Sequence, residues 1–175
     1  MRIETAILKN LLQNEDYTRK VLPFLKNDYF TENADKVLYD KIHEFVVKYN
    51  SLPSKEALVI DLSDTKMNED EFKDSMELLD VIEKDTENYT DINWLLDTTE
   101  RFCQDKAIYN AVVESISILD NPKSKSNKGV IPEILSDALA VSFDPHVGHD
   151  YLDDSDDRFD YYHRVEERIP FDLDY

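Results

Sequence analysis

Glycine is nearly absent from this chain of 175 residues, which contains only Gly129 and Gly148. Tight turns and phosphate-cradling loops both depend on glycine, so all-β folds and nucleotide-binding α/β folds are disfavoured. Neither glycine is followed by Lys-Ser or Lys-Thr, and the GxxxxGK[ST] phosphate loop is therefore missing. The composition predicts an all-α fold that carries no P-loop ATP chemistry in these residues.

Cysteine and long apolar runs are also scarce. Cys103 is the single cysteine, which excludes a disulfide within the chain and a cysteine-rich zinc site. It follows Phe102 in an apolar-periodic segment, and this position indicates a buried structural thiol. The sequence contains no run of 18 apolar residues and no secretory leader, so we expect a cytoplasmic protein without membrane contacts.

Basic residues are outnumbered by acidic ones, 20 to 39, giving a formal charge of −19. The formal charge is 0 over residues 1–60, −11 over 61–100, +2 over 101–130 and −10 over 131–175. Binding to a nucleic acid backbone requires Lys or Arg to replace condensed counterions. This surface therefore disfavours a direct grip on DNA.

The longest helical pattern covers residues 91–121. Asp91 can cap its start, and Asn121-Pro122 cannot continue it. At 1.5 Å per residue it would reach roughly 40 Å, which is longer than a domain of this size needs internally. Apolar residues recur at spacings of three and four, which indicates packing along a partner helix. They are Leu95, Phe102, Tyr109, Val112, Ile116 and Leu119, with Thr98 and Asp105 as weak members of the pattern.

A second helix is expected to return along the first. Pro132 suits a first helical turn, after the polar loop 121–129 (NPKSKSNKG). The apolar face of the return consists of Ile131, Ile134, Leu135, Ala138 and Leu139. We expect an αα-hairpin with Phe102, Tyr109 and Ile116 inside it and with the tip beyond Val112 shared between chains. The loop lysines 123, 125 and 128 could keep the tip soluble or contact DNA or an acidic partner.

Residues 1–90 predict a bundle of short helices. Pro23 should end or kink the second helix, Ser54 should cap the fourth, and Asn68 with Glu71 has the spacing of a capping box for the fifth. The expected helices cover residues 3–12, 16–25, 34–49, 54–62 and 68–84.

Residues 144–175 form a third expected region. Pro145 and Gly148 indicate a linker before a last amphipathic helix at about residues 150–168. This helix could join the same core, but its position favours docking on another domain or chain. Its apolar face consists of Leu152, Phe159, Tyr162, Val165 and Ile169. The domain boundaries are therefore 1–90, 91–143 and 144–175.

An acidic run near the last helix raises the question of a metal site. It contains Asp150, Asp153, Asp154, Asp156, Asp157 and Asp160 beside His146, His149 and His163. These side chains could bind Mg, Mn or Zn, although the calcium-loop pattern fails. An acidic helix start with a solvated face explains the run more simply. We expect no catalytic, cofactor-binding or metal-binding residue.

The order of these elements resembles a known family over essentially the whole chain. The resemblance rests on Asp28-Tyr29-Phe30, Leu52-Pro53-Ser54, the long helix around 102–118, the return 129–144 (GVIPEILSDALAVSFD) and the segment 142–150 (SFDPHVGHD). Together they resemble the N-terminal region of T-even-type phage replicative helicases, relatives of the DnaB-type hexameric helicases. The segment 142–150 is closest to the phage subgroup.

The resemblance implies a non-catalytic collar of a ring helicase that unwinds duplex DNA at the phage replication fork. Hairpins of neighbouring subunits would pair, so that six copies assemble as a trimer of dimers, and the last helix would dock on an adjacent motor domain. The expected subunit interface on the hairpin consists of Leu95, Phe102, Tyr109, Val112, Ile116, Leu119, Ile131, Ile134, Leu135 and Ala138. Primase and a helicase loader would be partners, in the bacterial host cytoplasm. ATP, Mg²⁺ and DNA would be handled by an ATPase motor expected after residue 175.

Two other functions are compatible with the residues alone. An acidic adaptor or DNA mimic could bind a basic partner through residues 61–100 or 150–160. A metal-dependent enzyme could use His146, His149 and the aspartates.

Overall fold

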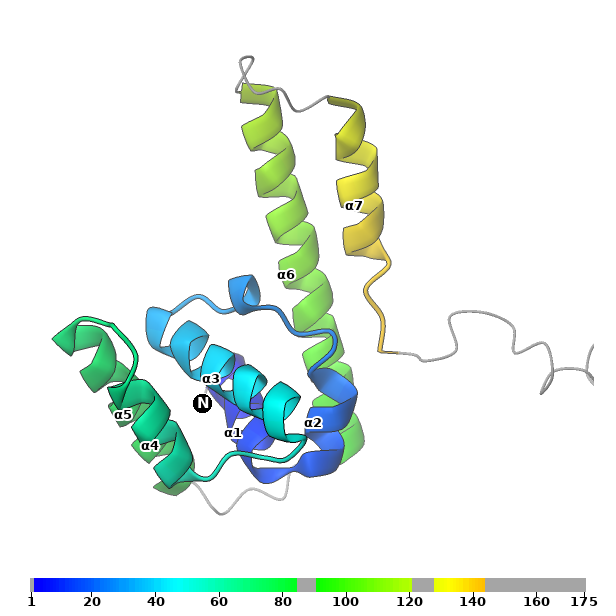
Figure 1. The fold of residues 1–175 in the computed structure, drawn as a ribbon. Coiled ribbons are helices and arrows are strands. Elements are labelled where there is room, and N and C mark those ends of the chain that lie inside the picture. The colour runs from blue at the N-terminus through cyan, green and yellow to red at the C-terminus, as the bar shows by residue number, and fades with distance from the viewer. Residues whose placement is uncertain (1, 85–90, 121–127, 144–175) are drawn as a thin grey trace, which may run out of the picture. The chain divides into compact units, whose positions relative to one another are not determined.

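The fold was analysed in a computed structural model, which describes residues 2–84, 91–120 and 128–143 (Figure 1). These residues form seven α-helices and two 3₁₀ turns, with no strand among them, which confirms the all-α prediction. The helices are α1 (Ile3–Gln13), α2 (Glu15–Val21), α3 (Asn33–Tyr49), α4 (Lys55–Ser63), α5 (Glu69–Lys84), α6 (Ile92–Asp120) and α7 (Ile131–Leu139), with the turns η1 (Asn27–Tyr29) and η2 (Lys128–Val130).

The helix ends follow the capping chemistry of the sequence. Ser54 accepts a hydrogen bond from the backbone N–H of Ala57 at 3.2 Å and caps α4. Asn68 and Glu71 form a reciprocal capping box, in which each side chain accepts from the other's backbone N–H, at 2.7 and 3.3 Å. Helix α2 ends at Val21, two residues before Pro23. The predicted caps of α4 and α5 are confirmed, whereas the second helix is shorter than the expected range 16–25, because it ends before Pro23.

The core lies where α1 meets α2, α3, α5 and α6. Its fully buried large side chains include Ile7, Leu8, Leu11, Tyr17, Tyr29, Phe30, Leu38, Ile42, Leu58 and Leu95. Each such side chain contributes about 1.5–3 kcal/mol through removal of its apolar surface from water. The first half of α6 belongs to this core, and residues 1–143 form one compact unit.

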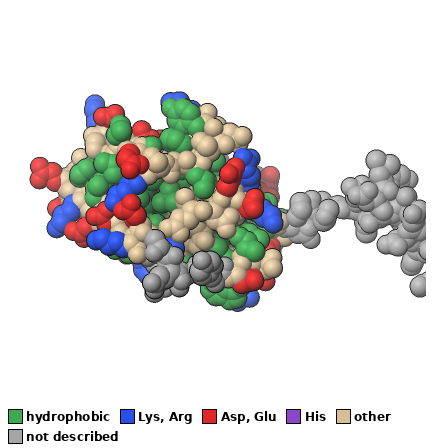
Figure 2. Space-filling view, turned by 90° about the horizontal axis from the view of Figure 1, so that it is seen from below, with side chains coloured by type: hydrophobic (Ala, Val, Ile, Leu, Met, Phe, Trp, Pro, Cys, Tyr) green, Lys and Arg blue, Asp and Glu red, His purple; other side chains and the backbone are tan. Residues whose placement is uncertain are grey.

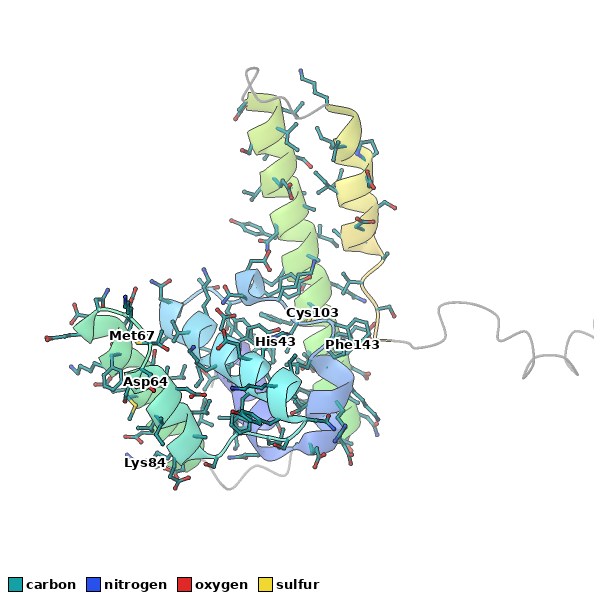
Figure 3. All side chains as sticks on the ribbon, in the orientation of Figure 1. His43, Asp64, Met67, Lys84, Cys103 and Phe143 are labelled. Carbon is teal, nitrogen blue, oxygen red and sulfur yellow. The ribbon has the colours of Figure 1, made fainter. Side chains whose placement is uncertain are left out.

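Cys103 lies in this core on α6 and is fully buried (Figure 3). Burial raises the pKa of its thiol to about 12, with a further contribution from the charge of Glu100. The prediction of a buried structural thiol is confirmed.

The surface of the unit mixes charged and apolar side chains. In the face shown in Figure 2, Lys, Arg, Asp and Glu side chains surround apolar patches. Among the described residues, no helix is long and apolar enough to cross a membrane. The predicted last helix, with Leu152, Phe159, Tyr162, Val165 and Ile169, lies outside the described residues, as do His146, His149 and the aspartates near them.

Candidate assembly surface on helix α6

Helix α6 begins at a strong cap and is held at its base by a buried hydrogen bond. Asp91 accepts from the backbone N–H groups of Asn93 and Trp94 at 2.9 and 3.0 Å, as predicted. About two turns after Asp91, the Tyr17 hydroxyl of α2 lies 2.7 Å from Oγ1 of Thr99. The base of α6 is therefore fixed to the globular part of the unit.

A second set of contacts ties the chain after α7 back to α6. Oε1 of Glu100 accepts from the backbone N–H of Phe143 and from the Ser142 hydroxyl, both at 3.0 Å. The Gln104 amide donates to the carbonyl of Val141 at 3.0 Å. The ring of Phe143 stacks on Phe24 with centroids 4.8 Å apart (Figure 3). Both ends of the hairpin are thus anchored on the same unit.

The buried face of α6 follows a four-residue spacing. It consists of Leu95, Thr99, Cys103, Ala107, Ala111 and Ser115, with Phe102 beside Cys103. Four residues turn an α-helix by about 400°, so this row rotates by about 40° at each step. The row therefore faces the globular core at Leu95 and faces α7 at Ala111 and Ser115, because α7 runs back along the upper half of α6 (Figure 1).

Small side chains along the upper row let α7 approach closely. Ala107, Ala111 and Ser115 are at most 8% exposed, and Ala138 of α7 is buried to the same degree. Ile134 and Leu135 of α7 pack partly against the core. Because the row of α6 at this contact consists of alanine and serine, the apolar residues of α7 are buried against small side chains. The large apolar residues of α6 are consequently left elsewhere on its surface.

Those large residues form what we call the apolar arc. On a helical wheel they occupy a sector of about 140° that starts beside the α7 contact, and between residues 106 and 119 no polar residue falls in it. The exposed fractions of the six side chains run from 38% to 66%. They are Ile108, Tyr109, Val112, Val113, Ile116 and Leu119. Leu139 of α7 is also 72% exposed.

The structure corrects part of the sequence prediction. Tyr109 and Ile116 are not inside the hairpin, because they are 66% and 51% exposed. Phe102 and Leu95 are 8% and 1% exposed, and they lie in the core of the unit, out of reach of a second chain. The ring of Phe102 packs against the ring of Phe30, with centroids 6.2 Å apart.

Four of the predicted interface residues do belong to the apolar arc: Tyr109, Val112, Ile116 and Leu119. Of the four on α7, Ala138 is buried, and Ile131, Ile134 and Leu135 are half-buried. Ile108 and Val113 were missed. A wheel of residues 106–119 would have found them, because the sector is free of polar residues in the sequence itself.

The apolar arc is a candidate binding surface. A contiguous apolar sector on a helix that projects beyond its own core is typical of protein–protein contacts. Within residues 2–84, 91–120 and 128–143, no three His, Cys, Asp or Glu side chains converge into a group that could hold a metal ion.

Comparison with known proteins identifies a relative. The chain is 33% identical over 175 residues to a DnaB-like replicative helicase of Enterobacteria phage T4. The resemblance is confirmed. The alignment covers 95% of this chain and 36% of the relative, so the chain spans about a third of the length of the protein it matches. No family model matches the sequence.

The match to this helicase is consistent with an N-terminal domain of a DnaB-type helicase. It extends across both the globular helices and the hairpin, because only 5% of the chain falls outside it. The part of the chain that carries the apolar arc is therefore similar to a part of this phage helicase.

Proposed function

We propose that this chain is the non-catalytic assembly and docking domain of a ring-shaped replicative DNA helicase. The similarity supports a helicase-related role, and it favours this role over a stand-alone acidic adaptor. The observation that supports assembly is the apolar arc, whose six side chains are exposed on the outer half of a helix of 29 residues. In the proposal, the arc is covered by the hairpin of a second subunit.

The free energy that this contact can supply favours assembly in a ring over an isolated dimer. Covering the exposed half of six large side chains would release about 1 kcal/mol each, or roughly 6 kcal/mol per chain. Association costs an estimated 4–15 kcal/mol in lost freedom. Pairing two hairpins covers both arcs and releases roughly 12 kcal/mol, so at most about 8 kcal/mol remains after this cost. A pair alone should therefore bind with a Kd of about 1 μM or weaker, and the assembly gains strength when several contacts close a ring.

The finer features of the proposal come from the resemblance. Six copies would assemble as a trimer of paired hairpins, primase and a helicase loader would dock on this collar, and the last helix would dock on an adjacent motor domain. ATP and Mg²⁺ would be used by the motor domain, which would also hold the DNA. The formal charge of −19 supports binding of DNA by the motor domain and not by the collar, because an acidic surface does not attract a phosphate backbone.

Sedimentation velocity over a range of concentrations tests the proposal. We expect reversible self-association of the chain, weakened about tenfold by Ile116→Asp, since a buried charge without a partner is costly. Ile60→Asp is the matched control, because Ile60 is 60% exposed on α4 and Ile116 is 51% exposed on α6. A strictly monomeric chain, or equal effects of the two variants, would contradict assembly through the hairpin.

A further inference from the structure

A groove lies on the globular part of the unit, away from the apolar arc. It has a volume of about 680 Å³ and runs between α5 and the start of α3. One wall is formed by Asp70, Asp74 and Glu77 of α5. The other contains Arg2, the segment 31–34 and Asp35. None of these residues takes part in the hairpin.

The walls of the groove are strongly acidic. Six carboxylates line it, those of Glu32, Asp35, Asp70, Glu71, Asp74 and Glu77, against the single guanidinium of Arg2, which leaves an excess of five negative charges. Arg2 is already engaged within the protein. Its Nη2 donates to both carboxylate oxygens of Asp35, at 3.1 and 2.9 Å, and its Nη1 forms a second ion pair with Glu32 at 3.5 Å. On the α5 side, Glu77 forms an exposed ion pair with Lys73 at 3.7 Å. Among the described residues, Asp70 and Asp74 have no such partner, so their charge faces the groove uncompensated.

Two apolar residues of α5 also line the groove. Val81 is 56% exposed there, and Leu78 beside it is half-buried. Val81 follows Asp70, Asp74 and Glu77 at spacings of four, three and four, so these four residues lie along one face of α5. From Asp70 to Val81, eleven steps of 1.5 Å along the helix, this face is about 16 Å long. It could hold about three turns of a helix.

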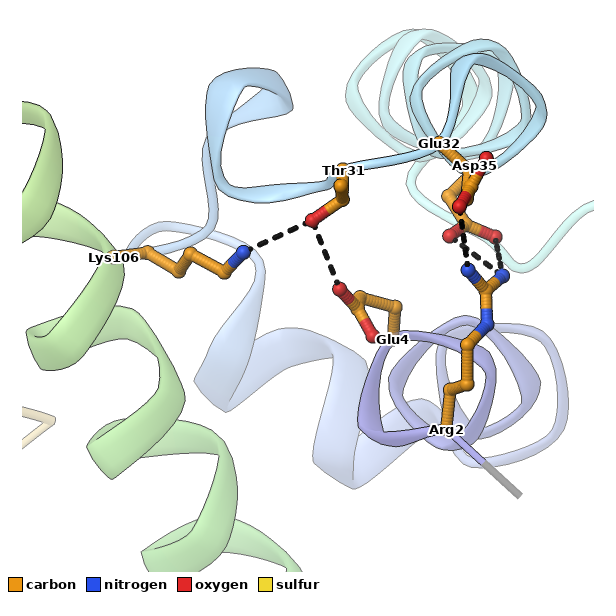
Figure 4. A network of polar contacts seen from close by, with 6 residues as sticks. All are labelled: Arg2, Glu4, Thr31, Glu32, Asp35 and Lys106. Carbon is orange, nitrogen blue, oxygen red and sulfur yellow. Dashed lines mark hydrogen bonds and ion pairs between the residues drawn. The ribbon is translucent and has the colours of Figure 1, made fainter.

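The wall opposite α5 is held in place by polar contacts (Figure 4). Lys106 of α6 donates to the Thr31 hydroxyl at 3.0 Å, and Thr31 donates to Glu4 at 3.3 Å. Asp35, which is fully buried, is fixed by Arg2. A wall that is ordered in advance does not have to lose freedom when a ligand binds.

We propose that this groove binds a basic amphipathic helix of a partner protein. The inference rests on the proposed docking function and names the surface and the chemistry of that contact. Lysine and arginine side chains of the partner would pair with the carboxylates of Asp70, Asp74 and Glu77, and its apolar side chains would cover Val81 and Leu78. A nucleic acid does not fit, because its phosphates would meet the same carboxylates.

Titration of the protein with a fluorescent amphipathic helical peptide of lysine and leucine tests the groove. The triple variant Asp70→Asn, Asp74→Asn, Glu77→Gln should weaken binding about tenfold, since it removes three charge pairs of modest individual strength. The control triple variant Asp16→Asn, Asp40→Asn, Asp97→Asn removes the same charge from exposed positions outside the groove. It should change the affinity less than about twofold.

The role of the apolar lining is tested with a neutral pair of variants. Val81→Ser should weaken the peptide several-fold, whereas Val47→Ser, at a residue 69% exposed on α3 and outside the groove, should not. Thermal unfolding followed by circular dichroism shows that each variant is folded before its affinity is compared.

Three results would overturn the inference: no binding to the unmodified protein, equal weakening by both triple variants, or no weakening by the groove variant. Equal weakening would mean that the peptide responds to the overall charge of the protein. Sedimentation of the groove variant separates this inference from the assembly proposal. If self-association persists while the groove shows no selective binding, the assembly proposal stands and only the groove is rejected.

Discussion

The hydroxyl of Tyr17 lies 2.7 Å from Oγ1 of Thr99, joining two helices across 82 residues of sequence. Thr99 donates its own proton to the carbonyl of Leu95 at 2.8 Å, so Tyr17 is the donor in the pair. Burial raises the pKa of Tyr17 far above its usual value, so the hydroxyl keeps its proton throughout the physiological range.

This pair predicts an unequal response to mutation. Thr99→Val should cost about 1–3 kcal/mol of unfolding free energy, because it leaves the buried Tyr17 donor without an acceptor. Tyr17→Phe should cost less, about 1 kcal/mol, and the double variant should cost less than the sum of the two. Urea unfolding followed by circular dichroism measures all three. Equal losses of unfolding free energy for the two single variants, with a loss for the double variant equal to their sum, would contradict this arrangement.

Cys103 should resist thiol reagents in the native state. It is fully buried, and its pKa of about 12 leaves very little thiolate near neutral pH. Ellman's reagent should react slowly with the folded protein and rapidly after urea is added. Reaction of the folded protein at the rate of free cysteine would show that this part of α6 is open to solvent.

The Arg2–Asp35 pair predicts a stability loss that depends on pH. Burial raises the pKa of Asp35, and Arg2 lowers it in part, so Arg2→Gln should raise it further. A carboxyl whose pKa is higher in the folded state costs stability as pH rises through that pKa, and the cost disappears when the group is protonated. Arg2→Gln should therefore destabilise the protein near pH 7 by about 1–3 kcal/mol, with a smaller loss toward about pH 5.

The control for this prediction is Arg19→Gln. Arg19 is exposed and pairs with Glu15 of the same helix at 2.6 Å, so its loss should cost less than about 0.5 kcal/mol at either pH. Urea unfolding at the two pH values measures both variants. A loss for Arg2→Gln that is the same at both pH values would show that Asp35 is not the group responsible.

The close contact between α6 and α7 predicts that Ala111 cannot be enlarged. Ala111 is 5% exposed in the row that faces α7, so Ala111→Leu should force the helices apart and cost about 1–3 kcal/mol. Val113→Leu, at a residue 49% exposed on the same helix, should change stability by less than about 0.5 kcal/mol. Thermal unfolding measures the stability of both variants. An Ala111→Leu variant as stable as the unmodified protein would contradict close packing in the hairpin.

The helices could be predicted well because their ends depend on local chemistry. Each predicted cap bonds backbone groups within three residues, so the local sequence is enough to predict the helix end. These caps are Asp91, Ser54 and the Asn68–Glu71 box. The relationship to DnaB-type helicases could be inferred for a similar reason, since the order of the elements is visible along the chain.

The faces of α6 could not be predicted as well. The strongest apolar pattern in the sequence is the set of large side chains that recur every seven residues from Leu95 to Ile116. However, α7 packs on alanine and serine, and a search for large apolar side chains does not detect that face. Which face of a helix is covered depends on tertiary packing. The groove was hidden for the same reason, because Glu32 and Asp35 come to face α5 only when the chain folds.

Disulfide cross-linking between chains is the most direct test of assembly through the apolar arc. Ile116→Cys and the control Ile60→Cys place exposed thiols on α6 and α4, while Cys103 is buried and can remain. Under mild oxidation at a concentration where the chain associates, we predict a cross-linked dimer for Ile116→Cys and little for Ile60→Cys. Equal amounts of dimer from the two variants, or none from Ile116→Cys, would contradict pairing of the hairpins.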